Sequence, residues 1–240
     1  ELYGFVPLGA AGSVEYRAYG GTLFLDTSSA NSAAGTITDL SVPYLIGGRL
    51  MWLPPIQGLQ LGGSVQALRL DFDFIPSAAT LQAMQANNQI PAGFSGVVES
   101  RIPAVLWVGS LEYSFNDFLF ATEFSRWSVD QESNLQIPDT HTNSDRYYAM
   151  TSYRIKPWFT PGLYYSVFFP KSGDWSNRKD YQHDIALTTR FDINDHWLVK
   201  LEGHFMHGTA ALNAAENDNT PLTALTRDWG LFMVKTTAYF

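Results

Sequence analysis

The stretch LTTRFDINDHWLVKLEGHF, residues 187–205, alternates apolar and polar side chains on both sides of a short INDH turn. Before the turn, Leu187 lies on the face opposite Arg190, and after it Leu201 lies opposite Glu202. Successive side chains of a strand point to opposite faces, so this pattern predicts two half-apolar strands joined as a hairpin. The fold depends on whether other segments of the chain keep the same pattern.

The composition of the 240-residue chain suits such strands and argues against several other classes of protein. Aromatic residues, which favour strands, make up 15% of the chain, and it has no cysteine for disulfides or thiolate metal sites. The formal charge of −8 argues against nucleic acid as a partner, because nucleic-acid binders carry a basic surface. The sequence indicates no cofactor, no metal site and no helical membrane span.

Alternation of this kind recurs along the chain. In ALRLDFDF, residues 67–74, apolar side chains alternate with Arg69, Asp71 and Asp73. The sequence therefore predicts an all-β, antiparallel transmembrane β-barrel with about eleven strands. These strands are expected near 2–8, 12–25, 42–53, 59–74, 102–115, 117–128, 145–156, 162–169, 182–193, 196–208 and 229–240.

Short and long connections alternate between the predicted strands. Tight turns such as PPIQG at 54–58 and FND at 115–117 alternate with polar stretches such as VDQESNLQIPDTHTNSD at 129–145. Transmembrane barrels have this asymmetry, and a soluble β-sandwich, the other fold considered, gains nothing from it. Aromatic side chains flank the turns, where the girdle at a membrane surface lies: Trp52, Phe115, Phe118, Trp158, Phe159 and Trp197.

The last predicted strand, WGLFMVKTTAYF at 229–240, is amphipathic and ends on the aromatic Phe240. This strand and the 187–205 hairpin resemble the C-terminal portion of Gram-negative outer-membrane porins, and more loosely the phosphate-selective and related substrate-specific porins. The resemblance implies a channel embedded in lipid and lipopolysaccharide, with its C-terminus in the periplasm and a homotrimer as the family's habit. No basic ladder stands out of the kind that a phosphate-selective pore needs.

The function that the sequence predicts is passive diffusion of small hydrophilic solutes through a water-filled lumen. One alternative is a structural barrel that holds a partner protein in its lumen, and a second is an outer-membrane hydrolase. No serine has the surroundings of a catalytic nucleophile, so neither an enzyme nor a catalytic residue is predicted. His204 and His207 form an HxxH motif, but residues three apart on a strand point to opposite faces and cannot share a metal.

Charged side chains on the strands should point into the lumen, because a charge facing lipid at mid-depth costs about 2–4 kcal/mol. The residues predicted to contact lipid are Leu187, Phe191, Val199, Leu201, Phe205, Phe232 and Val234. The residues predicted to line the pore are Arg17, Arg49, Arg69, Asp71, Asp73, Glu112, Glu123, Arg154, Arg190, Lys200, Glu202, His204 and Lys235. The same alternation assigns Glu15, Arg146, Lys156, Asp184 and Asp192 to the lumen.

Two further expectations concern the extent of the domain. Residues 77–88 have a helical pattern between two prolines, and we expect a short helix in an outer loop rather than a loop folded into the lumen. Single-chain barrels usually have an even number of strands, whereas the count here is odd. We therefore expect residues 1–240 to be a single barrel domain that lacks an N-terminal portion of a pore of about sixteen strands.

Overall fold

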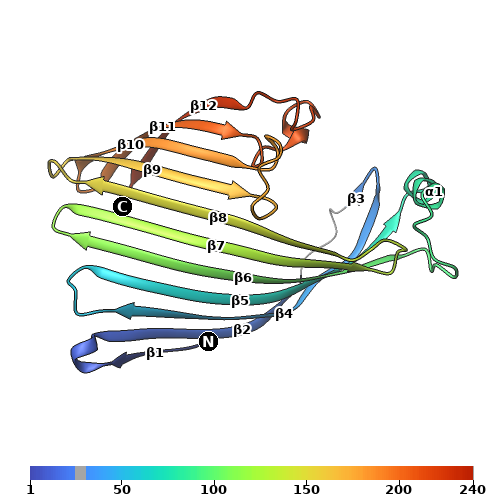
Figure 1. The fold of residues 1–240 in the computed structure, drawn as a ribbon, viewed down its shortest axis with the longest axis horizontal. Coiled ribbons are helices and arrows are strands. Elements are labelled where there is room, and N and C mark those ends of the chain that lie inside the picture. The colour runs from blue at the N-terminus through green and yellow to red at the C-terminus, as the bar shows by residue number, and fades with distance from the viewer. Residues whose placement is uncertain (25–30, 240) are drawn as a thin grey trace.

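The computed structural model describes residues 1–24 and 31–239, which form one antiparallel sheet with two edges (Figure 1). Each main strand pairs with the next along the chain, and the short β3 pairs only with β4. The predicted all-β antiparallel fold is confirmed. The strands are β1 (Leu2–Pro7), β2 (Ser13–Phe24), β3 (Asn31–Ser32), β4 (Gly35–Leu53), β5 (Leu59–Pro76), β6 (Val98–Phe115), β7 (Phe118–Ser133), β8 (Thr140–Tyr153), β9 (Phe159–Phe169), β10 (Gln182–Asn194), β11 (Trp197–Gly208) and β12 (Asp228–Ala238).

All the predicted strands are present, but several are longer than expected at the end away from the tight turns. The stretch 129–145, expected to be a loop, is largely strand, because β7 continues to Ser133 and β8 begins at Thr140. β4 likewise begins at Gly35 instead of near residue 42. In these extensions both faces carry polar side chains, so alternation of apolar and polar residues does not reveal them.

The tight turns gather at one end of the sheet and the longer connections at the other, as Figure 1 shows. We call these the turn end and the loop end. Between β6 and β7 the turn is reduced to two residues, with Asn116 at φ 52°, a conformation that asparagine tolerates in such hairpins. A helix, α1 (Ala78–Ala86), lies beyond the strand ends at the loop end, within the range 77–88. Ser77 caps it by accepting a hydrogen bond from the backbone of Thr80.

The register of the strands assigns every side chain to one of two faces. On β7 and β8, Glu123 pairs with Tyr148 and Phe124 pairs with Tyr147, so the two pairs point in opposite directions. Residues from β6 to β11 on the Glu123 side, among them Glu112 and Lys200, converge on one cavity. That side of the curved sheet is therefore concave, and the side that carries Phe124 is convex.

The apolar side chains lie mainly on the outside of this sheet. Among the described residues the buried hydrophobic ones are Val42, Val98, Ala104, Ala186 and Leu198. By contrast, convex-face residues such as Phe205 and Phe232 are 65% and 66% exposed. No helix in residues 1–24 or 31–239 is both long enough and apolar enough to span a membrane.

Candidate functional site

The convex face carries a continuous band without charge next to the turn end. On β7 this band extends from Phe118 to Phe124, and on β11 it extends from Trp197 to Phe205. A tilted strand crosses the hydrocarbon core of a bilayer in about 9–11 residues; the band spans the nine residues 197–205 on β11 and the shorter stretch 118–124 on β7. The predicted lipid-facing residues Leu187, Phe191, Val199, Leu201, Phe205, Phe232 and Val234 all lie in this band.

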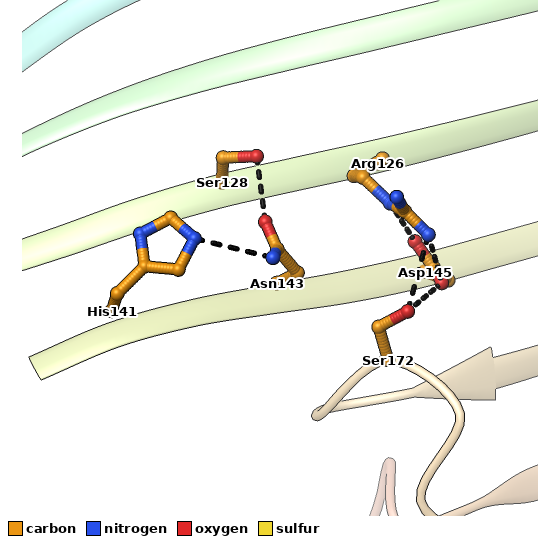
Figure 2. A network of polar contacts seen from close by, with 6 residues as sticks. All are labelled: Arg126, Ser128, His141, Asn143, Asp145 and Ser172. Carbon is orange, nitrogen blue, oxygen red and sulfur yellow. Dashed lines mark hydrogen bonds and ion pairs between the residues drawn. The ribbon is translucent and has the colours of Figure 1, made fainter.

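Charged side chains reappear on the convex face just beyond the band. Figure 2 shows Arg126 on β7 forming a two-pronged contact with Asp145 on β8, with Ser172 from the next loop bonded to the same carboxylate. The two Arg126–Asp145 distances are 2.7 and 2.9 Å. Further towards the loop end, Asn143 bonds to both Ser128 and His141. These contacts mark where the convex face changes from apolar to polar.

Aromatic rings border the band at both ends. At the turn end, Trp158 stacks on Phe191 with ring centroids 6.4 Å apart, and the Phe159 ring contacts both. At the loop end, Trp175 packs against Phe169 with centroids 4.5 Å apart. Trp and Tyr prefer the interface between water and lipid, because their rings are apolar and their N–H or O–H groups are polar. Sequence reasoning identified the girdle at the turn end only.

The register corrects the predicted orientation of Arg69, Asp71 and Asp73. On β5 these residues share the convex face with Leu61 and Val65, and the apolar residues of ALRLDFDF point to the concave side. This part of β5 lies beyond the charge-free band, towards the loop end. Arg69 and Asp71 also pair with each other at 2.8 Å.

The other predicted pore-lining residues lie on the concave side. Arg154, which follows β8, lines a cavity together with Arg190 and Lys200, and Lys156 lies in the turn beyond it. Residues that the register or a shared cavity places on the concave face are Arg17, Arg49, Glu112, Glu123, Arg154, Arg190, Lys200, Glu202, His204 and Lys235. Phe240 lies outside the described residues.

The concave face carries a row of cations that the sequence did not predict. Arg190 on β10 lies directly opposite Lys200 on β11, and Lys200 lies opposite Lys235 on β12. Like charges directly opposite each other on neighbouring strands repel. For Arg190 and Lys200, a carboxylate on the same strand offsets this repulsion. Arg190 contacts Asp192 at 2.6 Å, and Lys200 contacts Glu202 at 3.1 Å. Only the register could reveal this row.

The two histidines of the HxxH motif have different surroundings. His204 is on the concave face, where its Nδ1 lies 2.9 Å from an oxygen of Asp184, and its buried Nε2 has no hydrogen-bond partner among the described residues. His207 is on the convex face beside Asp228. The expected separation of the two rings therefore holds, and within the described ranges no group of three potential ligands could hold a metal.

No protein-family model matches the chain, and no curated protein is significantly similar to it in sequence. Solved structures are similar in fold. For the toluene transporter TbuX of Ralstonia pickettii, the identity is 10% and the TM-score 0.43, over 85% of this chain and 66% of that one. For a loop-deletion mutant of OmpT, an outer membrane protein of Vibrio cholerae, the identity is 9% and the TM-score 0.45, over 95% of this chain and 63% of that one.

A third structure, the toluene transporter TodX of P. putida, has 10% identity and a TM-score of 0.39, over 81% of this chain and 63% of that one. The chain therefore spans less than two thirds of the length of each of these three structures. The likeness is one of fold, to outer-membrane proteins with antiparallel β-barrels. None of the three is described as a phosphate-selective porin, so that finer resemblance gains no support.

Proposed function

We propose that the chain forms part of the wall of a passive channel in a bacterial outer membrane, through which small hydrophilic solutes diffuse. The observation that carries the proposal is the contrast between the two faces of the sheet. Next to the turn end the convex face has a band without charge, and the concave face carries charges of both signs at the same depth. Lipid solvates the first face and water the second. No cofactor and no chemical reaction are needed.

The charges on the concave face also bear on selectivity. Rings of fixed charge in a pore wall favour ions of the opposite sign. Here the cation row of Arg190, Lys200 and Lys235 is partly neutralised by carboxylates, and Glu112 on β6 and Glu123 on β7 add negative charge to the same face. We propose a channel with weak selectivity among small ions.

A water-filled lumen requires further strands at both edges of the sheet. Within the described residues, β1 and β12 each have one paired neighbour, so their outer N–H and C=O groups have no strand to bond. Such groups exposed to lipid cost several kcal/mol each. We propose that strands from another part of the same protein, or from a second copy, pair with both edges. The turn end then faces the periplasm and the loop end the outside.

The test is reconstitution of the full-length protein in planar lipid bilayers. We expect current steps whose height rises linearly with voltage, and passage of small sugars into vesicles. A silent barrel that co-purifies with a protein in its lumen would overturn the proposal in favour of a scaffold. A barrel that passes toluene but no ions would overturn the hydrophilic solute class.

Two adjacent residues of β6 provide a matched control for this test. Ser110 lies on the concave face opposite Glu123, whereas Gly109 lies on the convex face with open space around it. Ser110→Trp should therefore reduce the height of each conductance step, and Gly109→Trp should leave it unchanged. Equal effects of the two substitutions would contradict the assignment of the faces.

A further inference from the structure

A cavity of about 280 Å³ opens on the concave face between β7, β8, β9 and β10. Glu123, Arg146, Tyr148 and Tyr164 contribute to its lining. On the convex side of the same strands lie Phe124 and Tyr147, which belong to the charge-free band. The cavity therefore lies level with the loop-end border of the band, inside the proposed lumen.

Three charged residues line this cavity: Asp184 contacts His204, whereas Glu123 and Arg146 do not pair with each other. Glu123 lies directly across from Tyr148, and Arg146 lies across from Ser125, so the two charged residues are diagonal neighbours on adjacent strands. Diagonal positions are about 7–8 Å apart, too far for a direct ion pair unless both side chains lean together. Neither residue has an ion-pair partner among the described residues, whereas Arg190, Lys200 and His204 on the same face each have one.

The aromatic rings in the cavity hold these charges in place. The Arg146 guanidinium lies over the Phe168 ring, with its central carbon 4.4 Å from the ring centroid, a cation–π contact. Tyr148 stacks on Tyr164 with ring centroids 5.8 Å apart, directly beside Glu123. An ammonium group between Glu123 and these rings would gain both a carboxylate and an electron-rich aromatic face.

We propose that this cavity binds zwitterionic solutes of the α-amino acid type. The solute carboxylate would accept hydrogen bonds from Arg146, whose planar guanidinium suits two-point binding of a carboxylate. The solute ammonium would lie between Glu123 and the Tyr148 ring. This inference rests on the proposed channel only in that the solute reaches the cavity through the lumen.

Other classes of solute complement the cavity less well. An anion without an ammonium group would bring its charge close to Glu123, and a cation without a carboxylate would bring its charge close to Arg146. A neutral solute would leave both protein charges without an opposite charge. Only a solute with both signs matches the lining, because complementarity of charge determines which partner is favoured.

Equilibrium binding to the detergent-solubilised full-length protein tests the proposal, with isothermal titration calorimetry as the measurement. The probes are L-alanine, L-lactate, which lacks the ammonium group, and L-alaninamide, which lacks the carboxylate. We expect the Kd for L-alanine to be lower than that for either analogue by about tenfold, since each analogue loses a charged hydrogen bond. Equal affinities for the three probes, or no binding of L-alanine, would overturn the proposal.

Three substitutions identify the groups involved. Arg146→Met should remove the preference for L-alanine over L-alaninamide, and Glu123→Gln should remove the preference over L-lactate. Arg17→Met alters a concave-face arginine far along the sheet, opposite Arg49, and should leave both preferences unchanged. Loss of both preferences in the Arg17 variant would show that binding depends on the general charge of the lumen and not on this cavity.

The same samples separate this inference from the proposed function. Selective binding of L-alanine by a protein that shows no conductance would refute the channel and leave the site intact. Conductance together with equal binding of the three probes would refute the site and leave the channel intact.

Discussion

The convex and concave faces of this sheet are built from the same strands, yet they follow opposite rules. Next to the turn end, the convex face excludes charge, and where charges begin, as at Arg126 and Asp145, they contact each other directly. The concave face carries charges at the same depth, and some of them, such as Glu123 and Arg146, have no ion-pair partner. This contrast is what a barrel wall between lipid and a water-filled lumen requires, because a charge that faces lipid is costly and one that faces water is not.

Two adjacent threonines of β10 point to opposite faces, and substitutions there should have the largest effects. Thr189 lies on the convex face opposite Leu201, and Thr188 lies on the concave face opposite Glu202. Thr189→Arg should destabilise the protein by about 2–4 kcal/mol, because it brings a charge into hydrocarbon. Urea unfolding in lipid vesicles measures this loss.

The matched variant is Thr188→Arg, which introduces the same side chain one residue earlier. Its charge faces the lumen beside Glu202, so we expect a change in stability of less than about 0.5 kcal/mol. Equal losses in the two variants would mean that the convex face does not contact lipid, or that the register is wrong by one residue.

The Arg126–Asp145 contact tests where the charge-free band ends on the side of the loop end. Asp145→Ala leaves Arg126 without its carboxylate, and we expect a loss of about 1–2 kcal/mol, moderated because the Arg126 side chain is 43% exposed. A double-mutant cycle with Arg126→Met measures the coupling. If the double variant is no more stable than Asp145→Ala alone, the unpaired Arg126 is fully hydrated. The membrane would then end closer to the turn end than the charge-free band indicates.

A smaller effect concerns charge on the concave face alone. Lys235→Met removes the member of the cation row that has no carboxylate partner among the described residues. The reversal potential in a salt gradient should shift towards cation preference, while stability changes by less than about 0.5 kcal/mol. Glu202→Gln, which removes a carboxylate from the same face, should shift it in the opposite direction.

The last and smallest effect that we expect concerns the pKa of Asp174, in the loop 170–181 beyond the sheet. Hydrogen bonds from the Ser176 hydroxyl and backbone N–H lower the pKa of Asp174 from its ordinary value of 3.8. A lowered folded-state pKa means that this stabilisation is present above pH 3.8 and is lost as the pH falls through the lower folded value. Ser176→Ala should raise the Asp174 titration midpoint, as measured by carboxyl NMR. An unchanged midpoint would show that the bonds do not persist in water.

The hairpin at 187–205 shows how much the sequence could predict. Its alternation predicted the two strands, the turn between them and the division of their side chains between two faces, all of which the register shows. The same reasoning failed for ALRLDFDF. Alternation separates two sets of residues without stating which set faces outward, and beyond the membrane that choice no longer follows from hydrophobicity.

The candidate site could not be predicted from the alternation of side chains, because it depends on the register between strands. Arg190, Lys200 and Lys235 are distant in sequence, and only the register brings them into one row. The pairing of Glu123 with Tyr148 and of Arg146 with Ser125 is likewise a property of register. Sequence reasoning assigned both charges to the lumen but could not bring them to one cavity.

The order of the strands in the sheet is also their order along the chain, apart from the small side branch at β3. Within residues 1–24 and 31–239, each hairpin of the sheet pairs only with the hairpins that precede and follow it in the sequence. Duplication or loss of one hairpin therefore changes the circumference of the wall without rethreading any other segment. Because barrel diameter grows roughly in proportion to strand number, such an event would give evolution a simple way to change pore size.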